Sequence, residues 1–369
     1  MYPQLRLTGD AFSRGRQYGE LGADRIRRSI QAYGEVFAHY ASWDWSRVTG
    51  EAAKFIGPIE AFGPKYLTEM RGIAEGAKVA FLDVLAINVR TEIMFAARAR
   101  DAAVRTPTTG ECTAFAAIPP DDRAVLTGQN WDWQVHSYET TVVLEVAPDD
   151  GPRYVTVVEA GLLAKAGFNE HGLGIVTNAL VCDDDRGEPG VPYHVLLRAM
   201  LDATNAAEAL AVLQRAERSS SASYLISSKN GLALGVEATP GDFTRLLLTM
   251  PDARGLVLHT NHFVHPRFDR KDIGTWVFPD SPFRYQRVDR NLSQSDPFAS
   301  STYERLFADH AGHPDGVCCH PRPEVIEQER GATIFSVVMN LRELTMRLAP
   351  GLPCQTGYRT LDYAAFFSG

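Results

Sequence analysis

The sequence changes its hydrophobic periodicity once, near residue 111, and this change restricts the fold more than any other feature. Before it, residues 23–43 and 64–95 carry apolar side chains at the spacing of amphipathic helices. After it, short β-branched runs separated by turns predict strands at 124–133, 141–147, 153–160, 173–181, 221–228, 232–240 and 244–250. Helices followed by many antiparallel strands indicate an α+β fold built in layers.

Local signals refine this division. Asn230-Gly231 lies between two alternating runs and predicts a hairpin, and residues 333–350 predict further strands. Gly15 and Gly19 interrupt the first helical part, and residues 100–111 form a polar link that we expect to be an exposed loop. Helices are expected at 193–203, at 205–217 and near 301, the last two opened by the capping patterns Asn205-x-x-Glu208 and Ser301-x-x-Glu304.

Composition excludes several functional classes. With 37 basic and 45 acidic residues the net charge is −8, and no basic run offers a nucleic-acid surface. The N-terminus lacks the apolar core of a signal peptide, and no apolar stretch reaches the roughly 20 residues of a membrane span. Five scattered cysteines do not form a disulfide pattern and suit a reducing compartment. We therefore expect a cytoplasmic protein with no nucleic-acid or membrane partner.

A cysteine stands where the periodicity changes, in the stretch GECTAF at residues 110–115. If the bond between Glu111 and Cys112 were cut, Cys112 would carry a free α-amino group close to its own thiol, and this amine would serve as the base. The thiol itself is able to make the cut, by attacking the Glu111 carbonyl in an N-to-S acyl shift. The alternative is a half-buried packing cysteine at the start of a strand.

Three polar residues are candidate partners of this cysteine. Asp132 lies in QNWDW, and two strands joined by a turn would place it beside the start of the first strand. There it would anchor the α-ammonium group, although this segment taken alone favours a turn cap at Asp132 with the tryptophans in the core. Asn178 and Asn261 each end an apolar run, where a carboxamide either donates to an oxyanion or forms a turn.

A metal site is not expected. His259, His262 and His265 are spaced by three, and on a strand this spacing sends side chains to alternating faces. The stretch Cys318-Cys319-His320 would be their partner in a zinc site, but we interpret its cysteines as packing or exposed residues. Neither a glycine-rich phosphate loop nor the GxSxG pattern of serine hydrolases occurs.

Taken together in their order, several motifs resemble one family. They are GRQYGELGADRI at residues 15–26, YLTEMRGIAEGA at 66–77, LDVLAINVRTEI at 82–93, ECTAF at 111–115, GQNWDW at 128–133, NEHGLGIVTNAL at 169–180, HTNHF at 259–263 and SPFRYQRV at 281–288. This order resembles the acyl-coenzyme A:6-aminopenicillanic-acid acyltransferase family, a branch of the N-terminal-nucleophile hydrolases related to bile salt hydrolases. The resemblance covers most of the chain.

The resemblance implies a single four-layer αββα domain over residues 1–369 that cuts itself before Cys112. An α segment of residues 1–111 and a β segment of residues 112–369 would then form a heterodimer. The implied catalytic residues are Cys112 as nucleophile, Asp132 as the residue that orients its amine, Asn178 and Asn261 at the oxyanion, and Arg284, with Arg287 as the less favoured alternative.

Two positions depart from the family patterns. Gln129 stands where the bile salt branch has arginine, so bile acid recognition is not supported. Glu111 stands where the penicillin enzyme has glycine, and a bulky charged residue there either slows self-cleavage or assists thioester hydrolysis.

The implied function is acyl transfer or hydrolysis at a C–N bond or thioester of small acylated amines or peptides. No metal or organic cofactor is expected, and acyl-coenzyme A stays open as a co-substrate by analogy. The alternative is an unprocessed, catalytically silent binding or structural protein with the same fold.

Overall fold

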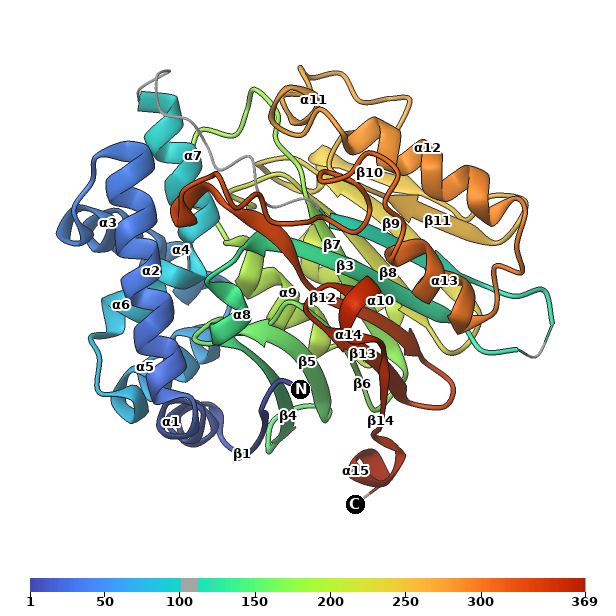
Figure 1. Cartoon of the computed structure of the whole chain (residues 1–369). Helices are drawn as coiled ribbons and strands as arrows, with labels where there is room; N and C mark the ends of the chain where they lie inside the picture. The colour runs from blue at the N-terminus through green and yellow to red at the C-terminus, as the bar shows by residue number, and fades with distance from the viewer. Residues whose placement is uncertain (101–111, 122, 369) are drawn as a thin grey trace.

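The structure is a computed structural model that describes residues 1–100, 112–121 and 123–368 (Figure 1). The loop expected at 100–111 and the proposed cleavage residue Glu111 therefore lie outside the described residues, apart from residue 100. No helix in the described part of the chain is long and apolar enough to cross a membrane.

The N-terminal part is helical, as predicted. It contains α1 (Ala11–Leu21), α2 (Ala23–Ala41), α3 (Trp45–Ala52), α4 (Ile56–Phe62), α5 (Pro64–Ala77), α6 (Phe81–Asn88) and α7 (Arg90–Arg100). The apolar pattern at 64–95 is divided among three of these helices. The short strand β1 (Gln4–Gly9) was not predicted, and it pairs in parallel with a strand that follows Cys112 in the chain. Its pattern is too short to stand out beside the helices.

The interpretation of Gly15 and Gly19 as interruptions was wrong. Both lie inside α1, where the backbone of α5 crosses very closely. A Cβ atom on Gly15 would lie 2.2 Å from the carbonyl oxygen of Glu69, and one on Gly19 would lie 2.2 Å from that of Ile73. Glycine is needed here for close packing of two helices and not for a turn.

The strands form two sheets. The first has the order β1-β4-β5-β6-β7-β8-β9-β10, and the second has the order β11-β2-β3-β12-β13-β14. The bounds in the first sheet are β4 (Thr141–Pro148), β5 (Tyr154–Glu159), β6 (Ala166–Asn169), β7 (Leu173–Ala179), β8 (Ala222–Ser228), β9 (Leu232–Ala238) and β10 (Leu246–Thr249). Those in the second are β2 (Cys112–Ala117), β3 (Leu126–Gln134), β11 (Leu256–His259), β12 (Gly331–Asn340), β13 (Thr345–Pro350) and β14 (Arg359–Asp362).

The remaining helices lie on the outer faces of the sheets or at their ends. Helices α9 (Tyr193–Leu201) and α10 (Ala206–Gln214) pack on β7 and β8. Helices α12 (Ser281–Leu292) and α13 (Ser300–Phe307) pack on the second sheet, at the opposite side of the molecule (Figure 1). The short helices are α8 (Ser137–Thr140), α11 (Gly274–Val277), α14 (Pro353–Thr356) and α15 (Ala364–Ser368).

Alternation along the strands produces three apolar interfaces. In β4, Val142 belongs to the interface between the helices and the first sheet, while its neighbour Val143 belongs to the interface between the two sheets. In β12, Val337 faces the space between the sheets and Val338 faces α12 and α13. Three buried interfaces separate four layers, and the predicted α+β sandwich of type αββα is confirmed.

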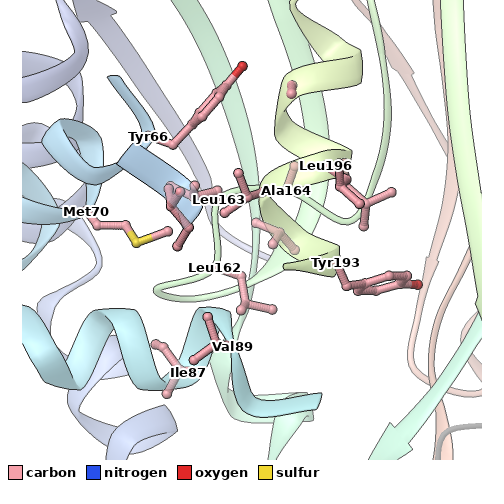
Figure 2. Close-up of a cluster of buried hydrophobic side chains, with 14 of the residues drawn as sticks. Tyr66, Met70, Ile87, Val89, Leu162, Leu163, Ala164, Tyr193 and Leu196 are labelled. Carbon is pink, nitrogen blue, oxygen red and sulfur yellow. The ribbon is translucent and has the colours of Figure 1, made fainter. Parts of the chain in front are cut away.

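The apolar interface between the helices and the first sheet extends to the candidate site. Figure 2 shows Leu162, Leu163 and Ala164, which connect β5 to β6, packed between the helices that carry Ile87 and Leu196. This connection is fully buried, and its backbone is also held by the polar side chains of Asn88 and His194. It positions Lys165, the residue directly before β6, with little freedom to move.

Two further local predictions can be compared with the structure. The hairpin at Asn230-Gly231 joins β8 to β9, and Gly231 has a φ of +81°. The cap at Asn205 is also confirmed, because its side chain accepts a hydrogen bond from the backbone N–H of Glu208 at 3.0 Å. The cap at Ser301 was wrong, since α13 begins at Ser300 after Ala299, without a side-chain cap.

Candidate active site

Cys112 opens β2 and is almost fully enclosed. It is 1% exposed, and it pairs with Trp131 of the neighbouring antiparallel strand β3. Its thiol faces a cavity of about 60 Å³. The cavity is bordered mainly by apolar side chains, among them Met94, Phe95, Trp131, Trp133, Val181 and Phe278.

Side chains from three distant elements hold the main chain of Cys112. Its backbone N–H donates to Oδ1 of Asn261 at 2.6 Å. Its carbonyl oxygen accepts from Nδ2 of Asn178 at 2.9 Å and from Nη1 of Arg284 at 2.9 Å. Arg284 also donates to Oδ1 of Asn261 at 3.0 Å. The structure thus brings Asn178, Asn261 and Arg284 together around the main chain of Cys112.

The fold explains this convergence. Strand β11 pairs with β2, so the chain that leaves β11 carries Asn261 past the start of β2. Asn178 lies on β7 of the opposite sheet, and β7 contacts β2 across the interface. Arg284 is buried on the inner side of α12, where Asp280 four residues earlier accepts from its Nε. Three layers of the sandwich therefore meet at Cys112.

The two asparagines have different contacts. Asn178 donates towards the Cys112 carbonyl and, at 3.4 Å, to the carbonyl of His259. Asn261 instead accepts from the nitrogen of Cys112, and its own Nδ2 donates to the carbonyl of Ala179 at 3.0 Å. In this arrangement Asn178 is the donor at the carbonyl and Asn261 is the acceptor at the nitrogen.

Asp132 follows Trp131 on β3 and is 1% exposed. Its carboxylate accepts from the Thr333 hydroxyl at 2.5 Å through Oδ1, whereas Oδ2 has no hydrogen-bond partner among the described residues. Burial raises the pKa of this carboxyl to about 7, against the opposing effects of Thr333 and Arg284. The Asp132 backbone is next to the nucleophile, but its side chain borders a different, more polar cavity.

The thiol of Cys112 is a weak acid in this environment. Burial raises its pKa to about 11, while the positive charges of Lys165 and Arg284 and the backbone N–H of Asp132 oppose the increase. At neutral pH the thiol is therefore protonated in the intact chain. It needs a nearby base before it becomes a nucleophile.

Lys165 was missed by the sequence analysis. It is 5% exposed, lies on the border of the Cys112 cavity, and donates to the Tyr193 hydroxyl at 3.0 Å. Burial lowers the pKa of its amine to about 8, partly offset by Cys112. A sequence signal does exist, because Lys165 is the single charged residue in the apolar run AGLLAKAGF at 160–168. A lone charge in such a run needs a buried partner.

A second buried polar group lies behind Lys165. Arg90 donates to Nε2 of His194 at 2.9 Å and pairs with the Glu159 carboxylate at 3.4 Å. Burial and the neighbouring charges of Arg90 and Lys165 hold the pKa of His194 well below its usual range, so this ring is neutral. Both Arg90 and His194 border the Cys112 cavity, and the charge of Arg90 gives it a positive side.

Other sequence candidates lie away from the nucleophile. Arg287 is exposed and pairs with Asp309 at 2.7 Å, which leaves Arg284 as the arginine at the site. His259 is bound to Glu237 at 2.9 Å and His262 to the Ser281 hydroxyl at 2.8 Å, so each ring has its own partner in the structure.

The polar cavity on the other side of Asp132 is larger, with a volume of about 390 Å³. Val277 borders both this cavity and the apolar one, so the two cavities are neighbours. Charged side chains from several loops surround it, including Asp280, Asp315, Arg322, Glu329 and Arg330. The site therefore combines a small apolar side with a wide polar side.

Comparison with known proteins places the chain in a family of acyltransferases. Residues 119–354 match the acyl-coenzyme A:6-aminopenicillanic acid acyl-transferase family, and the chain belongs to this family. The matched segment begins after Cys112 and contains Asp132, Asn178, Asn261 and Arg284. The resemblance recognised from the motifs is thereby confirmed.

One curated relative and three solved structures illustrate what this chain is similar to. The 40 kDa form of acyl-coenzyme A:6-aminopenicillanic-acid-acyltransferase of Emericella nidulans is 28% identical over 304 residues, which cover 81% of this chain and 79% of the relative. An N-acylethanolamine-hydrolyzing acid amidase orthologue of Caenorhabditis elegans aligns with a TM-score of 0.46 and 14% identity, over 63% of this chain and 93% of that chain. A conjugated bile acid hydrolase of Clostridium perfringens aligns with a TM-score of 0.47 and 14% identity, over 68% of this chain and 92% of that chain. Penicillin V acylase of Agrobacterium tumefaciens aligns with a TM-score of 0.42 and 15% identity, over 68% of this chain and 86% of that chain.

Proposed function

We propose that the chain cuts itself before Cys112 and then transfers or hydrolyses acyl groups through a thioester on this residue. The observation that supports this most strongly is the convergence of Asn178, Asn261 and Arg284 on the main chain of Cys112. A cysteine that merely packs in a strand needs backbone partners from neighbouring strands. Here the partners of its N–H and C=O are side chains from residues 66 to 172 positions away.

The first proposed step is an N-to-S acyl shift. The Cys112 sulfur attacks the carbonyl carbon of Glu111, the peptide C–N bond breaks, and the nitrogen of Cys112 takes up a proton to become an amine. Water then hydrolyses the thioester, which frees the Glu111 carboxyl group and restores the thiol. The products are an α segment of residues 1–111 and a β segment that begins with Cys112.

In the mature enzyme the new amine is the base that the thiol lacks. Asn261 Oδ1 already accepts from this nitrogen at 2.6 Å, and the unpartnered Oδ2 of Asp132 offers a counter-charge for an ammonium group. The amine takes the thiol proton, and the thiolate attacks the substrate carbonyl. Lys165 and Arg284 favour the thiolate by charge, and Asn178 is the proposed donor to the oxyanion.

The two cavities suggest how a substrate lies. We place its acyl group in the apolar cavity, between Phe95, Trp131 and Phe278, and its amine portion in the polar cavity beyond Asp132. With about 60 Å³ the apolar cavity holds a short group, so longer acyl chains require the aromatic rings to rotate. The acyl-enzyme then passes its acyl group to water or to an amine, and an acyl thioester such as acyl-coenzyme A is the proposed alternative donor.

Intact-mass measurement and N-terminal sequencing of the purified protein test self-cleavage. We expect wild type to yield two chains, the second starting Cys-Thr-Ala-Phe, whereas Cys112→Ala stays one chain. Cys182→Ala is the matched control, because Cys182 is also buried but lies outside both cavities, and it should cleave normally. A wild-type protein that stays intact and is not labelled by an acyl-thioester probe would instead identify a silent member of the family.

A substrate panel then separates the two outcomes of acylation. N-acyl amines that differ in acyl length are incubated with the mature enzyme, with and without an acceptor amine or an acyl thioester. Release of free acid indicates hydrolysis, and a new amide indicates transfer. Activity that survives in Cys112→Ala would contradict the proposed mechanism.

A further inference from the structure

Four metal-ligating side chains converge at the surface of the molecule, far along the chain from Cys112. Their ligand atoms, from His310, Cys318, His320 and Cys354, all lie within 4.8 Å of one another. The two sulfur atoms are 3.6 Å apart, and the ring nitrogens of His310 and His320 are 3.1 Å apart. His320 Nε2 lies 3.6 Å from the Cys318 sulfur and 3.5 Å from the Cys354 sulfur.

Four of the six separations are close to the edges of a tetrahedron around a zinc ion, and those from His310 to the two sulfurs are at most 4.8 Å. With Zn–S bonds of about 2.3 Å and Zn–N bonds of about 2.0 Å, tetrahedral angles place two sulfurs about 3.8 Å apart and two nitrogens about 3.3 Å apart. Two thiolates and two imidazoles are also the ligand set typical of closed structural zinc sites. We infer that His310, Cys318, His320 and Cys354 bind one zinc ion.

A disulfide does not account for the cluster. The distance of 3.6 Å between the sulfurs of Cys318 and Cys354 is far longer than a bond of about 2.05 Å. A disulfide would also not explain why the imidazoles of His310 and His320 converge on the same point. All four groups are explained together by a shared cation, which needs two thiolates and two neutral rings facing inward.

The site connects a long loop to the C-terminal part of the second sheet. His310, Cys318 and His320 belong to the segment between α13 and β12, and Cys354 belongs to α14 beyond β13. Cys318 is fully buried, whereas His310 and Cys354 are exposed, so an ion from solvent can reach the cluster. The proposed zinc would therefore fasten residues 308–330, a segment with little regular structure, to the body of the sheet.

This fastening bears on the catalytic side of the molecule. The backbone N–H of Cys319, next to the ligand Cys318, donates to the Thr333 hydroxyl at 2.9 Å. That hydroxyl donates in turn to the Asp132 carboxylate at 2.5 Å. His320 also borders the polar cavity. The inference nevertheless stands on the ligand geometry alone and does not depend on the proposed acyl chemistry.

The sequence contains a partial signal for this site. Cys318 and His320 stand close together in the stretch CCH, but they were considered as zinc ligands only together with the histidines at 259–265, and a metal site was not expected. The actual partner positions are ten residues before His320 and in a short helix near the C-terminus. Such spacing fits no common zinc motif, so the ligand set is visible only in the folded chain.

Metal analysis of the full-length protein tests the inference. Protein produced without a polyhistidine tag is loaded with zinc under reducing conditions, desalted, and measured by elemental mass spectrometry. We expect about one zinc per chain in wild type, and a loss of tight binding by at least about a hundredfold in Cys354→Ser and His310→Ala. His313→Gln is the matched control, because its ring contacts His310 and His320 but is not one of the four ligands, and it should retain the metal.

Cobalt loading of wild type gives a second readout that needs no variant to fold. A site with two thiolates produces intense visible bands of tetrahedral cobalt together with sulfur-to-metal charge-transfer absorption in the near ultraviolet. Absence of these bands, or zinc that survives in both ligand variants, would overturn the inference. So would a Cys318–Cys354 disulfide in wild type that persists under the reducing loading conditions.

Discussion

The molecule has two cysteine regions for which we propose a function, and they differ in what surrounds the sulfur. Cys112 is a single thiol 1% exposed between two sheets, with carboxamides at its main chain and the cations Lys165 and Arg284 nearby. The buried Cys318 and the exposed Cys354 form a pair within hydrogen-bond reach of an imidazole. In the roles that we propose, the first region presents fixed donors and charge to a reacting carbonyl, and the second presents four electron pairs to a cation.

In these proposals the neighbours of a cysteine determine its chemistry more than its burial does. Burial raises the pKa of the Cys112 thiol to about 11, and it raises that of Cys318 still further. What distinguishes them is the route to a thiolate. At Cys112 we propose a single amine released by peptide cleavage, and at Cys318 the proposed zinc ion displaces the proton itself.

The largest expected effect on turnover comes from replacing an asparagine by alanine, and we compare one such substitution in each region. Asn178→Ala removes a donor at the Cys112 carbonyl, and we expect turnover of an N-acyl amine to fall by about 10²–10³. Asn130→Ala is its counterpart at the second region, because Asn130 donates to the carbonyls of Phe307 and Val317, at the two sides of the loop that carries His310.

Asn130→Ala should lower the melting temperature and weaken zinc binding while turnover stays within about threefold of wild type, as for loss of a buried structural hydrogen bond. Steady-state kinetics, thermal unfolding and metal content are measured on both variants. If both asparagines affect turnover equally, the two regions are not chemically separate and the comparison fails.

A smaller effect is expected from the buried lysine. Lys165→Met keeps the length of the side chain but removes the ammonium group, whose charge lowers the pKa of the Cys112 thiol. Alkylation of Cys112 by iodoacetamide at pH 7 should slow about tenfold. Above a pH of about 8 the difference should shrink, because Lys165 itself loses its proton there.

Cys354 is the internal reference for this experiment. It is exposed and lies outside the cavity of Lys165, so its alkylation rate should not change. Both rates are read from the same sample by peptide mass spectrometry. A parallel slowing of both thiols would indicate a global change in structure and contradict the electrostatic role of Lys165.

The sequence predicted the layers and much of the candidate site, for a physical reason. Strand periodicity and the order of the motifs are local, and the register of β2 with β3 follows from two strands joined by a turn, which placed the Asp132 backbone correctly. Lys165 and the partnership of His310 with Cys354 depend on contacts between layers that are distant in sequence. The close packing of α1 against α5 also depends on contacts between segments distant in sequence. Gly15 and Gly19 were therefore wrongly interpreted as interruptions of a helix, because their role is to allow this packing.

The smallest effect concerns the pH dependence of stability at Asp132, measured in the uncleaved Cys112→Ala background. Burial raises the pKa of this carboxyl from 3.8 to about 7, so the folded chain binds more protons than the unfolded chain within that window. The free energy of unfolding should therefore decrease as pH rises from about 4 to 7, and the full cost of the buried charge is present above 7. Asp132→Asn removes this cost.

We expect Asp132→Asn to melt at nearly the same temperature as its parent near pH 4 and several degrees higher at pH 8. Glu208→Gln is the opposite control, because hydrogen bonds from Thr204 lower the pKa of Glu208, and its loss should slightly destabilise the chain at pH 8. A lower melting temperature for Asp132→Asn at pH 8 would mean that the carboxylate stabilises the intact fold. The unpartnered Oδ2 would then not be the proposed counter-charge for an ammonium group. Cys112 would thereby lose one feature that distinguishes it from Cys318 and Cys354.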